Sequence, residues 1–247
     1  MKKRTKRILV VLGAMAGMAV LALIYLGFSF QSELKSMSPL ESGPLREGVF
    51  AVKTDMVNFY LVRGPGGLLA LDAGSNAAMA AREMKRLGID PLEVKAVLLT
   101  HSDYDHIAAL PLFRNAVLYL SRDEVRMIDG STDRMLFLKN KIGSAYKTLA
   151  DGQELEAAGL KVKCLASPGH TPGSMCYLVD QAWLFTGDTI ALNEGRAGTF
   201  IKFFNMDGEA QRQAIPKLAG LSGVRAVFTA HHGMSDDYAR VFAGWKN

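Results

Sequence analysis

The sequence lacks an internal repeat, a low-complexity tract and, beyond its first seven residues, any net charge. Five cations in those seven residues account for the whole formal charge of +5, and the rest of the chain has 24 basic against 24 acidic residues. The sequence pI of about 9.2 therefore has a local origin and is no argument for a nucleic-acid partner. A chain of 247 residues without repeats suits one mid-sized globular domain plus an additional apolar segment.

Residues 8–30 contain no charged side chain and follow the basic cluster directly. This run of 23 residues is long enough to span the hydrocarbon core of a membrane as a helix. It ends without an A-x-A-like cleavage site, which favours an uncleaved signal anchor over a cleaved signal peptide. In both cases the basic end stays in the cytoplasm and the remainder is exported. We expect a basic stub and transmembrane helix over 1–30, a polar linker over 31–47 and an extracytoplasmic domain over 48–247.

Within this domain, short apolar segments rich in β-formers alternate with helical patterns. The expected strands are 49–62 with a break near Asp55, 68–71, 94–99, 116–120, 160–166, 175–179, 183–185 and 224–229. The expected helices are 76–87, 106–113, 121–127 and 209–221. Four strands lead into a residue that can bind a metal: Asp72, His101, Asp188 and His231. Strands that alternate with helices, after an initial meander, predict layered sheets with helices outside, an αβ/βα sandwich.

The histidines are few, and all five lie in three short segments: 100–106, 168–174 and 229–233. Asp188 lies between the last two segments. Imidazole and carboxylate groups hold divalent metals while leaving coordination positions open for water. Because no histidine remains for packing or surface positions, the segments predict one binuclear metal site.

These segments resemble the signature of the metallo-β-lactamase-fold hydrolases. The first block, His101-Ser102-Asp103-Tyr104-Asp105-His106, matches His-x-His-x-Asp-His except that Asp103 replaces the second histidine. A loop histidine, a bridging aspartate and a final histidine follow in the family's order as His170, Asp188 and His231. The resemblance covers about 48–245 and implies the family's four-layer αβ/βα sandwich.

The resemblance also implies a ligand set for two divalent ions, zinc foremost, with iron or manganese also suited. His101, Asp103 and His170 would hold the first ion, Asp105, His106 and His231 the second, and Asp188 would bridge them. Asp72 matches an early aspartate that supports a ligand histidine. Two alternatives stay open: Asp103 does not reach the metal, so that the first site is weak or empty, and His232 replaces His231.

The expected chemistry is hydrolysis of an ester, thioester, lactone or amide in a small-molecule substrate by a metal-bound hydroxide, which Asp105 and Asp188 orient. Asp103 lowers the charge of the core by one unit relative to a histidine, so we expect a milder Lewis acid. Asp188 argues against β-lactam hydrolysis, because the zinc β-lactamases usually lack it. The neutral domain surface speaks against a nuclease. The alternative, motivated by Asp103, is a metal-binding but non-hydrolytic envelope module.

Three further features carry weaker expectations. Tyr104 is expected to pack, although it could donate to an oxyanion. Residues 193–207, with Phe203 and Phe204, would lie near the mouth of the site as a substrate contact or as a solvated loop with two buried aromatics. Cys164 and Cys176 flank His170 symmetrically and could face each other across a hairpin, but two buried free thiols are the stronger expectation.

Overall fold

The computed structural model describes residues 2–134 and 139–245, which divide into a helical unit ending at Met37 and a domain beginning at Ser38. The first unit is the helix α1 (Lys2–Ser36). Its segment Val11–Ser36 contains an 18-residue window with a mean hydropathy of 2.2 and is long and apolar enough to cross a membrane. The helix continues past the expected boundary at residue 30, because 31–36 contains no glycine or proline to end it. The expected linker 31–47 is also shortened from its other end, where Gly43–Arg46 forms the strand β1.

The first sheet of the domain has seven strands in sequence order, β1 to β7. The strands are β1 (Gly43–Arg46), β2 (Val49–Thr54), β3 (Val57–Gly64), β4 (Gly67–Leu71), β5 (Val94–Leu98), β6 (Val117–Ser121) and β7 (Tyr146–Leu149). The first four form an antiparallel meander, and β4 to β7 are parallel. The predicted break near Asp55 is the β2–β3 turn, where Asp55 has a left-handed φ of 51°.

The second sheet has six strands in the order β15-β14-β11-β10-β9-β8. These are β8 (Glu154–Ala157), β9 (Leu160–Ala166), β10 (Met175–Val179), β11 (Trp183–Phe185), β14 (Ala226–Phe228) and β15 (Met234–Ser235). A separate hairpin joins β12 (Ile190–Asn193) to β13 (Arg196–Thr199). Only β11 and β14 are parallel neighbours in this sheet.

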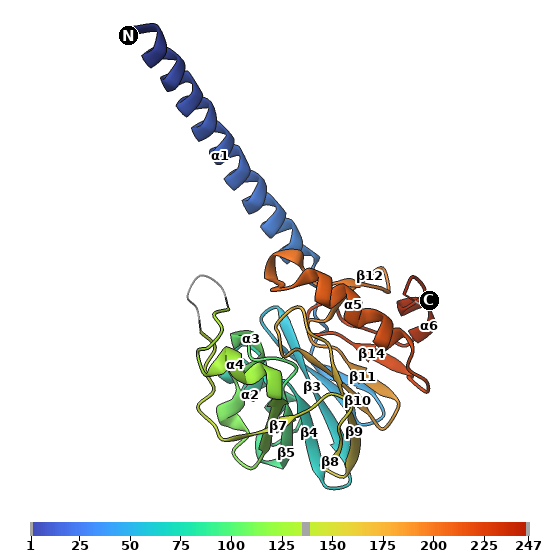
Figure 1. Ribbon diagram of the computed structural model, residues 1–247. Coiled ribbons are helices and arrows are strands. Elements are labelled where there is room, and N and C mark those ends of the chain that lie inside the picture. Colours follow the sequence, from blue (N-terminus) through green and yellow to red (C-terminus); the bar gives the residue numbers. More distant parts are fainter. Residues whose placement is uncertain (1, 135–138, 246–247) are drawn as a thin grey trace. The chain divides into compact units, whose positions relative to one another are not determined.

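Helices cover the outer face of each sheet (Figure 1). They are α2 (Ala77–Arg86), α3 (Tyr104–Ile107), α4 (Val125–Ile128), α5 (Gly208–Ala219) and α6 (Tyr238–Val241), and the short 3-10 helices are η1 (Pro91–Glu93), η2 (Leu110–Leu112), η3 (Arg122–Glu124) and η4 (Lys202–Phe204). Two helices begin at side-chain caps: the Asn76 side chain accepts from the Met79 N–H at the start of α2, and Ser121 accepts from the Asp123 N–H at the start of η3. The expected helix 106–113 is split into α3 and η2.

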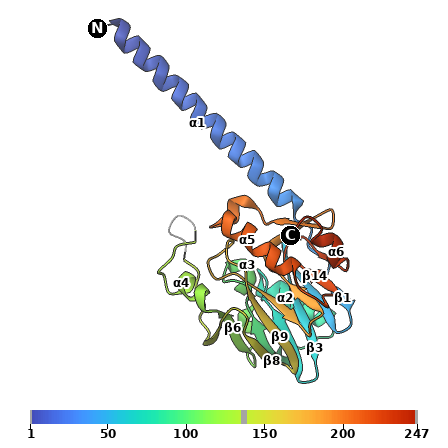
Figure 2. The same ribbon diagram turned by 45° about the vertical axis from the view of Figure 1, so that its right-hand side comes forward.

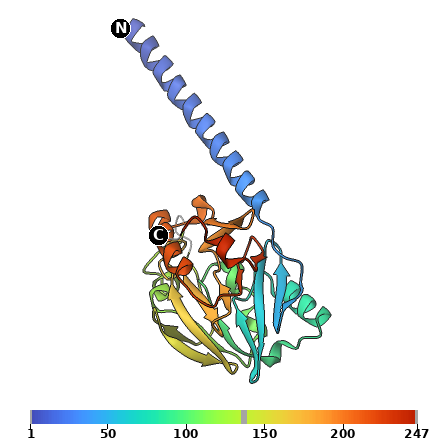
Figure 3. The same cartoon turned by 90° about the vertical axis from the view of Figure 1, so that its right-hand side faces the viewer.

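Three apolar clusters define the layers. Side chains along β3 alternate between two of these clusters. Tyr60 and Val62 belong to the cluster between the sheets, whereas Phe59 and Leu61 pack under α2. A third cluster joins the second sheet to α5 and α6 through Ile215 and Phe242. The domain is therefore an αβ/βα sandwich of four layers, as predicted, and turned views show the two sheets face to face (Figures 2 and 3).

The two cysteines lie on opposite faces of the second sheet. The strands β9 and β10 pair antiparallel as expected, but the register sets Tyr177 opposite Cys164 and Leu165 opposite Cys176. Cys164 packs between the sheets, and Cys176 packs under α5. Because facing residues share a side of a sheet and neighbours alternate, these thiols do not face each other. Both are free and buried.

Candidate metal centre

The ends of parallel strands bring the candidate ligands to one edge of the sandwich. Asp72 follows β4, and His101 lies three residues after its parallel neighbour β5. Asp188 follows β11, and His231 follows β14, which is parallel to it. The loop between β9 and β10 carries His170. Strand ends on rigid sheets fix these side chains although all of them stand in loops.

Asp188 lies at the centre of four histidine rings. Its Oδ2 atom is 3.5 Å from Nε2 of His170 and 4.0 Å from Nε2 of His101. Its Oδ1 atom is 3.6 Å from Nε2 of His106 and 3.4 Å from Nε2 of His231. One carboxylate thus offers one oxygen to each of two histidine pairs.

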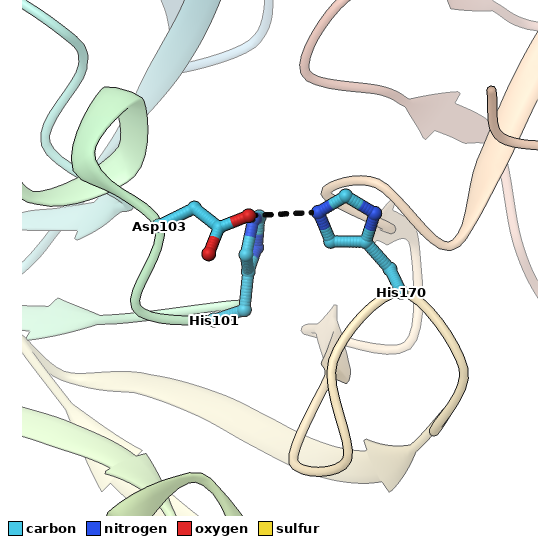
Figure 4. Close-up of side chains that lie close together, drawn as sticks. All are labelled: His101, Asp103 and His170. Atoms are coloured by element: carbon cyan, nitrogen blue, oxygen red, sulfur yellow. Dashed lines mark hydrogen bonds and ion pairs between the residues drawn. The ribbon is translucent and has the colours of Figure 1, made fainter. Parts of the chain in front are cut away.

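The other carboxylates divide between these pairs. We call His101, Asp103 and His170 the first half-site, in which Asp103 Oδ2 is 3.6 Å and 3.2 Å from the two Nε2 atoms (Figure 4). We call Asp105, His106 and His231 the second half-site, in which Asp105 Oδ2 is 3.8 Å and 3.4 Å from the two Nε2 atoms. In both half-sites the potential donor atoms lie within 4.8 Å of one another. The structure therefore brings all seven predicted ligands together.

The outer nitrogen of each ring has a hydrogen-bond acceptor. The Nδ1 partners are Thr100 Oγ1 at 3.0 Å for His101, Asp72 Oδ2 at 2.9 Å for His106, Asn205 Oδ1 at 3.2 Å for His170 and the Met56 carbonyl at 2.6 Å for His231. An acceptor at Nδ1 places the ring proton there and leaves the Nε2 lone pair pointing inward. Metal-binding histidines in proteins are usually held in this way.

Asp72 holds this arrangement from a strained backbone position. Its φ of 64° lies in the left-handed region, where a non-glycine residue is uncommon. One carboxylate oxygen accepts the Thr100 N–H at 2.7 Å. The other accepts the Thr100 hydroxyl at 2.8 Å in addition to His106. Because the Thr100 hydroxyl also accepts from His101, Asp72 orients one histidine of each half-site.

The donor set fits a pair of divalent cations. In the described part of the chain, His101 Nε2, His106 Nε2 and Asp188 Oδ1 are buried atoms without a hydrogen-bond partner. Such atoms are rare in folded proteins, because an unsatisfied buried polar atom costs about 1–3 kcal/mol. Imidazole nitrogens and carboxylate oxygens on opposing loops satisfy the preferences of zinc.

The charges of the site shift the pKa values of its members. Burial raises the pKa of Asp188, but the charges of His231 and His106 outweigh it and hold that pKa well below its usual range. Burial lowers the pKa of His231, but Asp188 and Asp105 raise it to about 10. In the first half-site burial prevails and lowers the pKa of His170.

The structure adds Arg134, which no motif indicated. Its Nε is 2.8 Å and 2.7 Å from the two oxygens of Asp103, and one terminal nitrogen is 3.2 Å from His170 Nε2 and 2.7 Å from the Phe204 carbonyl. Because the ion pair with Asp103 has no net charge, the sequence-based expectation of a less positive core loses its basis. Arg134 lies 31 residues beyond Asp103 in an irregular segment, so neither spacing nor periodicity could have revealed it.

Glu124 is a second unexpected residue, and it joins the loops of the first half-site. Its fully buried carboxylate accepts the Ser102 N–H at 2.8 Å and the Ser102 hydroxyl at 2.6 Å. Its other oxygen accepts the Thr171 hydroxyl at 2.6 Å. Glu124 thereby ties the neighbours of His101 and His170 together.

Two weaker expectations are corrected. Tyr104 does not pack, since 73% of it is exposed. In the segment after Asp188, Phe203 is 48% exposed, and the buried aromatic is Phe200, whose ring lies 5.2 Å from that of His170 and 5.4 Å from that of His231. Sequence reasoning chose the Phe203–Phe204 pair because adjacent aromatics stand out.

His232 is buried but lies outside both half-sites. Its ring contacts Phe200 at 5.8 Å between centroids, and its Nδ1 has no hydrogen-bond partner among the residues that the structure describes. Its neighbour His231 is the one whose Nε2 faces Asp105 and Asp188.

Comparison with known proteins identifies the family. A model of the metallo-beta-lactamase superfamily matches residues 52–233. The chain therefore belongs to the metallo-β-lactamase superfamily, and both the predicted family and the predicted fold are confirmed.

Its curated relatives are named as hydrolases. The chain is 37% identical over 101 residues to a probable polyketide biosynthesis zinc-dependent hydrolase, PksB, of Bacillus subtilis, a match that covers 40% of each protein. It is 30% identical over 177 residues to a hydroxyacylglutathione hydrolase of Brucella anthropi, covering 69% of this chain and 59% of the relative. The matches span about half the length of the first curated relatives.

Solved structures share the fold. A subclass B3 metallo-β-lactamase with an active-site glutamic acid has a TM-score of 0.63 at 19% identity, with 85% of this chain and 88% of that chain covered. A metallo-β-lactamase family protein from Thermus thermophilus has a TM-score of 0.60 at 20% identity, with 82% and 79% covered. At these identities the likeness concerns the architecture alone.

Proposed function

We propose that this chain is a hydrolase with a binuclear metal centre. The observation that supports it most is Asp188, whose two oxygens face two different histidine pairs at 3.4–4.0 Å. If Asp188 only formed ion pairs with protonated histidines, one or two histidine neighbours would be enough to balance its charge. Four rings with their Nε2 atoms inward match the ligand count of two ions.

His101, Asp103 and His170 are the proposed ligands of the first ion and Asp105, His106 and His231 those of the second, with Asp188 shared. Two divalent ions, zinc foremost, would supply a water of lowered pKa and would polarise the scissile carbonyl. The chain's own contribution is orientation. Asp72 and Thr100 hold the rings of His101 and His106, and Phe200 packs against the rings of His170 and His231.

Asp105 is placed to handle protons. Its side chain is 40% exposed, whereas the side chain of Asp188 is 4% exposed. Burial raises the pKa of Asp105, but the charges of His106 and His231 lower it to about 2. An ionised carboxylate that reaches from the second half-site toward solvent can orient a water and pass its proton outward.

The bond that we propose to be cleaved is a carbonyl bond, and a thioester foremost. Relatives of this chain are named hydroxyacylglutathione hydrolase and atrochrysone carboxyl ACP thioesterase, the latter 28% identical over 177 residues. Both names describe acyl thioesters on a thiol carrier. Esters, lactones and amides follow the same chemistry with a different leaving group.

The test is turnover by purified full-length protein in detergent. We expect hydrolysis of an S-acyl glutathione, followed through the released thiol, that a chelator abolishes and that added Zn²⁺ restores. The matched control is Asp236→Asn, at an exposed carboxylate that pairs with Arg46 and belongs to neither half-site. Zinc binding without turnover of thioester, ester, lactone or amide probes would instead support the non-hydrolytic envelope module.

We also propose that α1 anchors the domain to a membrane with the domain on the extracytoplasmic side. Five cations precede the apolar segment, and such flanks remain cytoplasmic. A periplasm-active reporter fused to the C-terminus should be active, and the protein should fractionate with membranes. A reporter active only in the cytoplasm would contradict this topology.

A further inference from the structure

Arg134 contacts the first half-site in a way that has no counterpart in the second among the described residues. Its side chain is 8% exposed and its Nε donates to both oxygens of Asp103. Asn140 donates to Asp103 Oδ1 as well, at 2.9 Å.

The guanidinium also reaches a histidine nitrogen that a metal would need. A terminal nitrogen of Arg134 lies 3.2 Å from His170 Nε2. Because His170 Nδ1 has Asn205 as its acceptor, Nε2 carries the ring's lone pair. A guanidinium has only donors, so this contact uses that lone pair. An imidazole nitrogen has one lone pair, and it cannot serve a guanidinium and a metal ion together.

The hydrogen-bond partners separate the atoms that Arg134 contacts from those that it does not. Asp103 and His170 Nε2 have such partners, whereas among the described residues His101 Nε2 in the same half-site and His106 Nε2 in the second have none. Within the described residues, the ion pairs of Asp105 are with His106 and His231 only. The second half-site is thus open to a cation, and the first is partly neutralised.

We propose that Arg134 competes with the first metal ion for Asp103 and His170, so that the two half-sites bind metal with unequal affinity and the second fills first. The inference rests on the proposed binuclear centre. For the first ion to bind, the guanidinium must leave His170 and release the inward oxygen of Asp103. It would then remain as a positive charge beside the ion, and like charges at such distances repel. Arg134 is therefore a residue that sets metal affinity through Asp103 and His170.

The experiment is a zinc titration of the full-length protein in detergent, after removal of metal, against a competing chromophoric chelator. The wild-type chain should bind two ions with dissociation constants that differ about tenfold or more. Arg134→Gln should tighten the weaker constant by roughly tenfold to a hundredfold, the range typical of neighbours of metal ligands, and leave the tighter one unchanged.

Two further variants make the result specific. Arg126→Gln removes the same charge from an exposed position in the same region and should leave both constants unchanged. Arg134→Lys keeps the charge but loses the planar fork, so its weaker constant should lie between those of wild type and Arg134→Gln.

The outcomes separate the possibilities. If Arg134→Gln weakens the first site or leaves it unchanged, Arg134 merely positions Asp103 and the inference is wrong. If Arg134→Gln does not fold, Arg134→Lys replaces it as the test, and wild-type dissociation constants in that variant would overturn the inference. Two equal dissociation constants in the wild-type protein would also overturn it. Zinc bound in this order without any hydrolysis would defeat the proposed function while leaving the competition intact.

Discussion

The two half-sites have the same ligand types, two imidazoles and one carboxylate, yet they differ in what surrounds them. In the first, Arg134 and Asn140 donate to the carboxylate. In the second, the carboxylate of Asp105 is 40% exposed and its ion pairs in the described structure are with histidines. We therefore expect the two half-sites to differ in metal affinity although their proposed ligands are of the same types. The neighbours of a ligand decide whether its lone pair is available.

The difference follows from where the ligands lie along the chain. His101 and Asp103, in the loop after β5, belong to the first half-site, and Asp105 and His106, in the first turn of α3, belong to the second. Asp103 turns toward the irregular segment that contains Arg134, whereas Asp105 turns toward His231. A six-residue motif can thus contribute side chains to two half-sites with chemically different neighbours.

The largest effect is expected from removing what both half-sites share. Asp188→Asn keeps the shape of the side chain but replaces an anionic oxygen with an amide group, which binds cations poorly. We expect the loss of at least one zinc ion and a drop in kcat/KM of about a thousandfold, equivalent to roughly 4 kcal/mol. Metal analysis and thioester kinetics measure it. Two retained ions with near-normal turnover would contradict the bridging role.

The ion pair of the first half-site gives the next largest effect, on stability. Asp103→Ala leaves the buried guanidinium of Arg134 without its partner, and we expect a loss of about 3 kcal/mol in the free energy of unfolding. The double variant Asp103→Ala/Arg134→Ala should recover much of this loss, because no uncompensated charge remains. Thermal unfolding of metal-free protein measures both. Equal stabilities for the single and double variants would show that the pair is not coupled.

The tandem histidines test the membership of the second half-site. His231→Ala should weaken zinc binding there by at least about a hundredfold, because a ligand nitrogen is lost. His232→Ala should retain both ions, because its ring packs on Phe200 outside the cluster. Zinc titration of the two variants gives the comparison. The reverse pattern would assign the ligand to His232.

Asp72 should produce a smaller change that reaches both half-sites through Thr100 and His106. Asp72→Asn weakens the hydrogen bond to the His106 ring, and we expect about a tenfold loss of zinc affinity. Asparagine tolerates the left-handed φ of 64° at this position, so the backbone is preserved. Asp72→Ala, which adds backbone strain, should also lower the melting temperature. Unchanged affinity in Asp72→Asn would exclude the orienting role.

The smallest effect is a pH dependence that differs between the half-sites of the metal-free protein. The raised pKa of His231, about 10, means that its proton stabilises the fold fully below 6.5 and that this contribution is lost as the pH rises toward 10. The pKa of His170 is lowered, so its charging opposes folding at low pH.

Melting temperatures measured in chelator between pH 6 and 10 should therefore fall with rising pH, and His231→Gln should flatten the slope whereas His170→Gln should not. With zinc the slope should reverse, because ligand histidines must be neutral. A flat profile for the metal-free wild type would count against the charge distribution described for the second half-site.

The order and spacing of the site residues were readable from the sequence because they obey local rules. The sequence shows apolar strands that lead into Asp72, His101, Asp188 and His231, and the structure adds that β4 and β5 are parallel neighbours, as are β11 and β14. The alternation of strand and helix patterns predicts the four layers. The predicted element boundaries were less accurate: α1 continues to Ser36, and β1 lies within the expected linker.

What only the tertiary structure decided are contacts between segments that share no pattern. Arg134 meets Asp103 across 31 residues and His170 across 36, and Glu124 meets Thr171 across 47. A one-residue difference in strand register separated Cys164 from Cys176, and the fold chose Phe200 rather than its more conspicuous neighbours to face the histidines. A sequence motif shows which residues follow a strand, because that depends on the local chain. It does not show which distant side chain neutralises the charge of those residues, because that depends on how irregular segments pack in the fold.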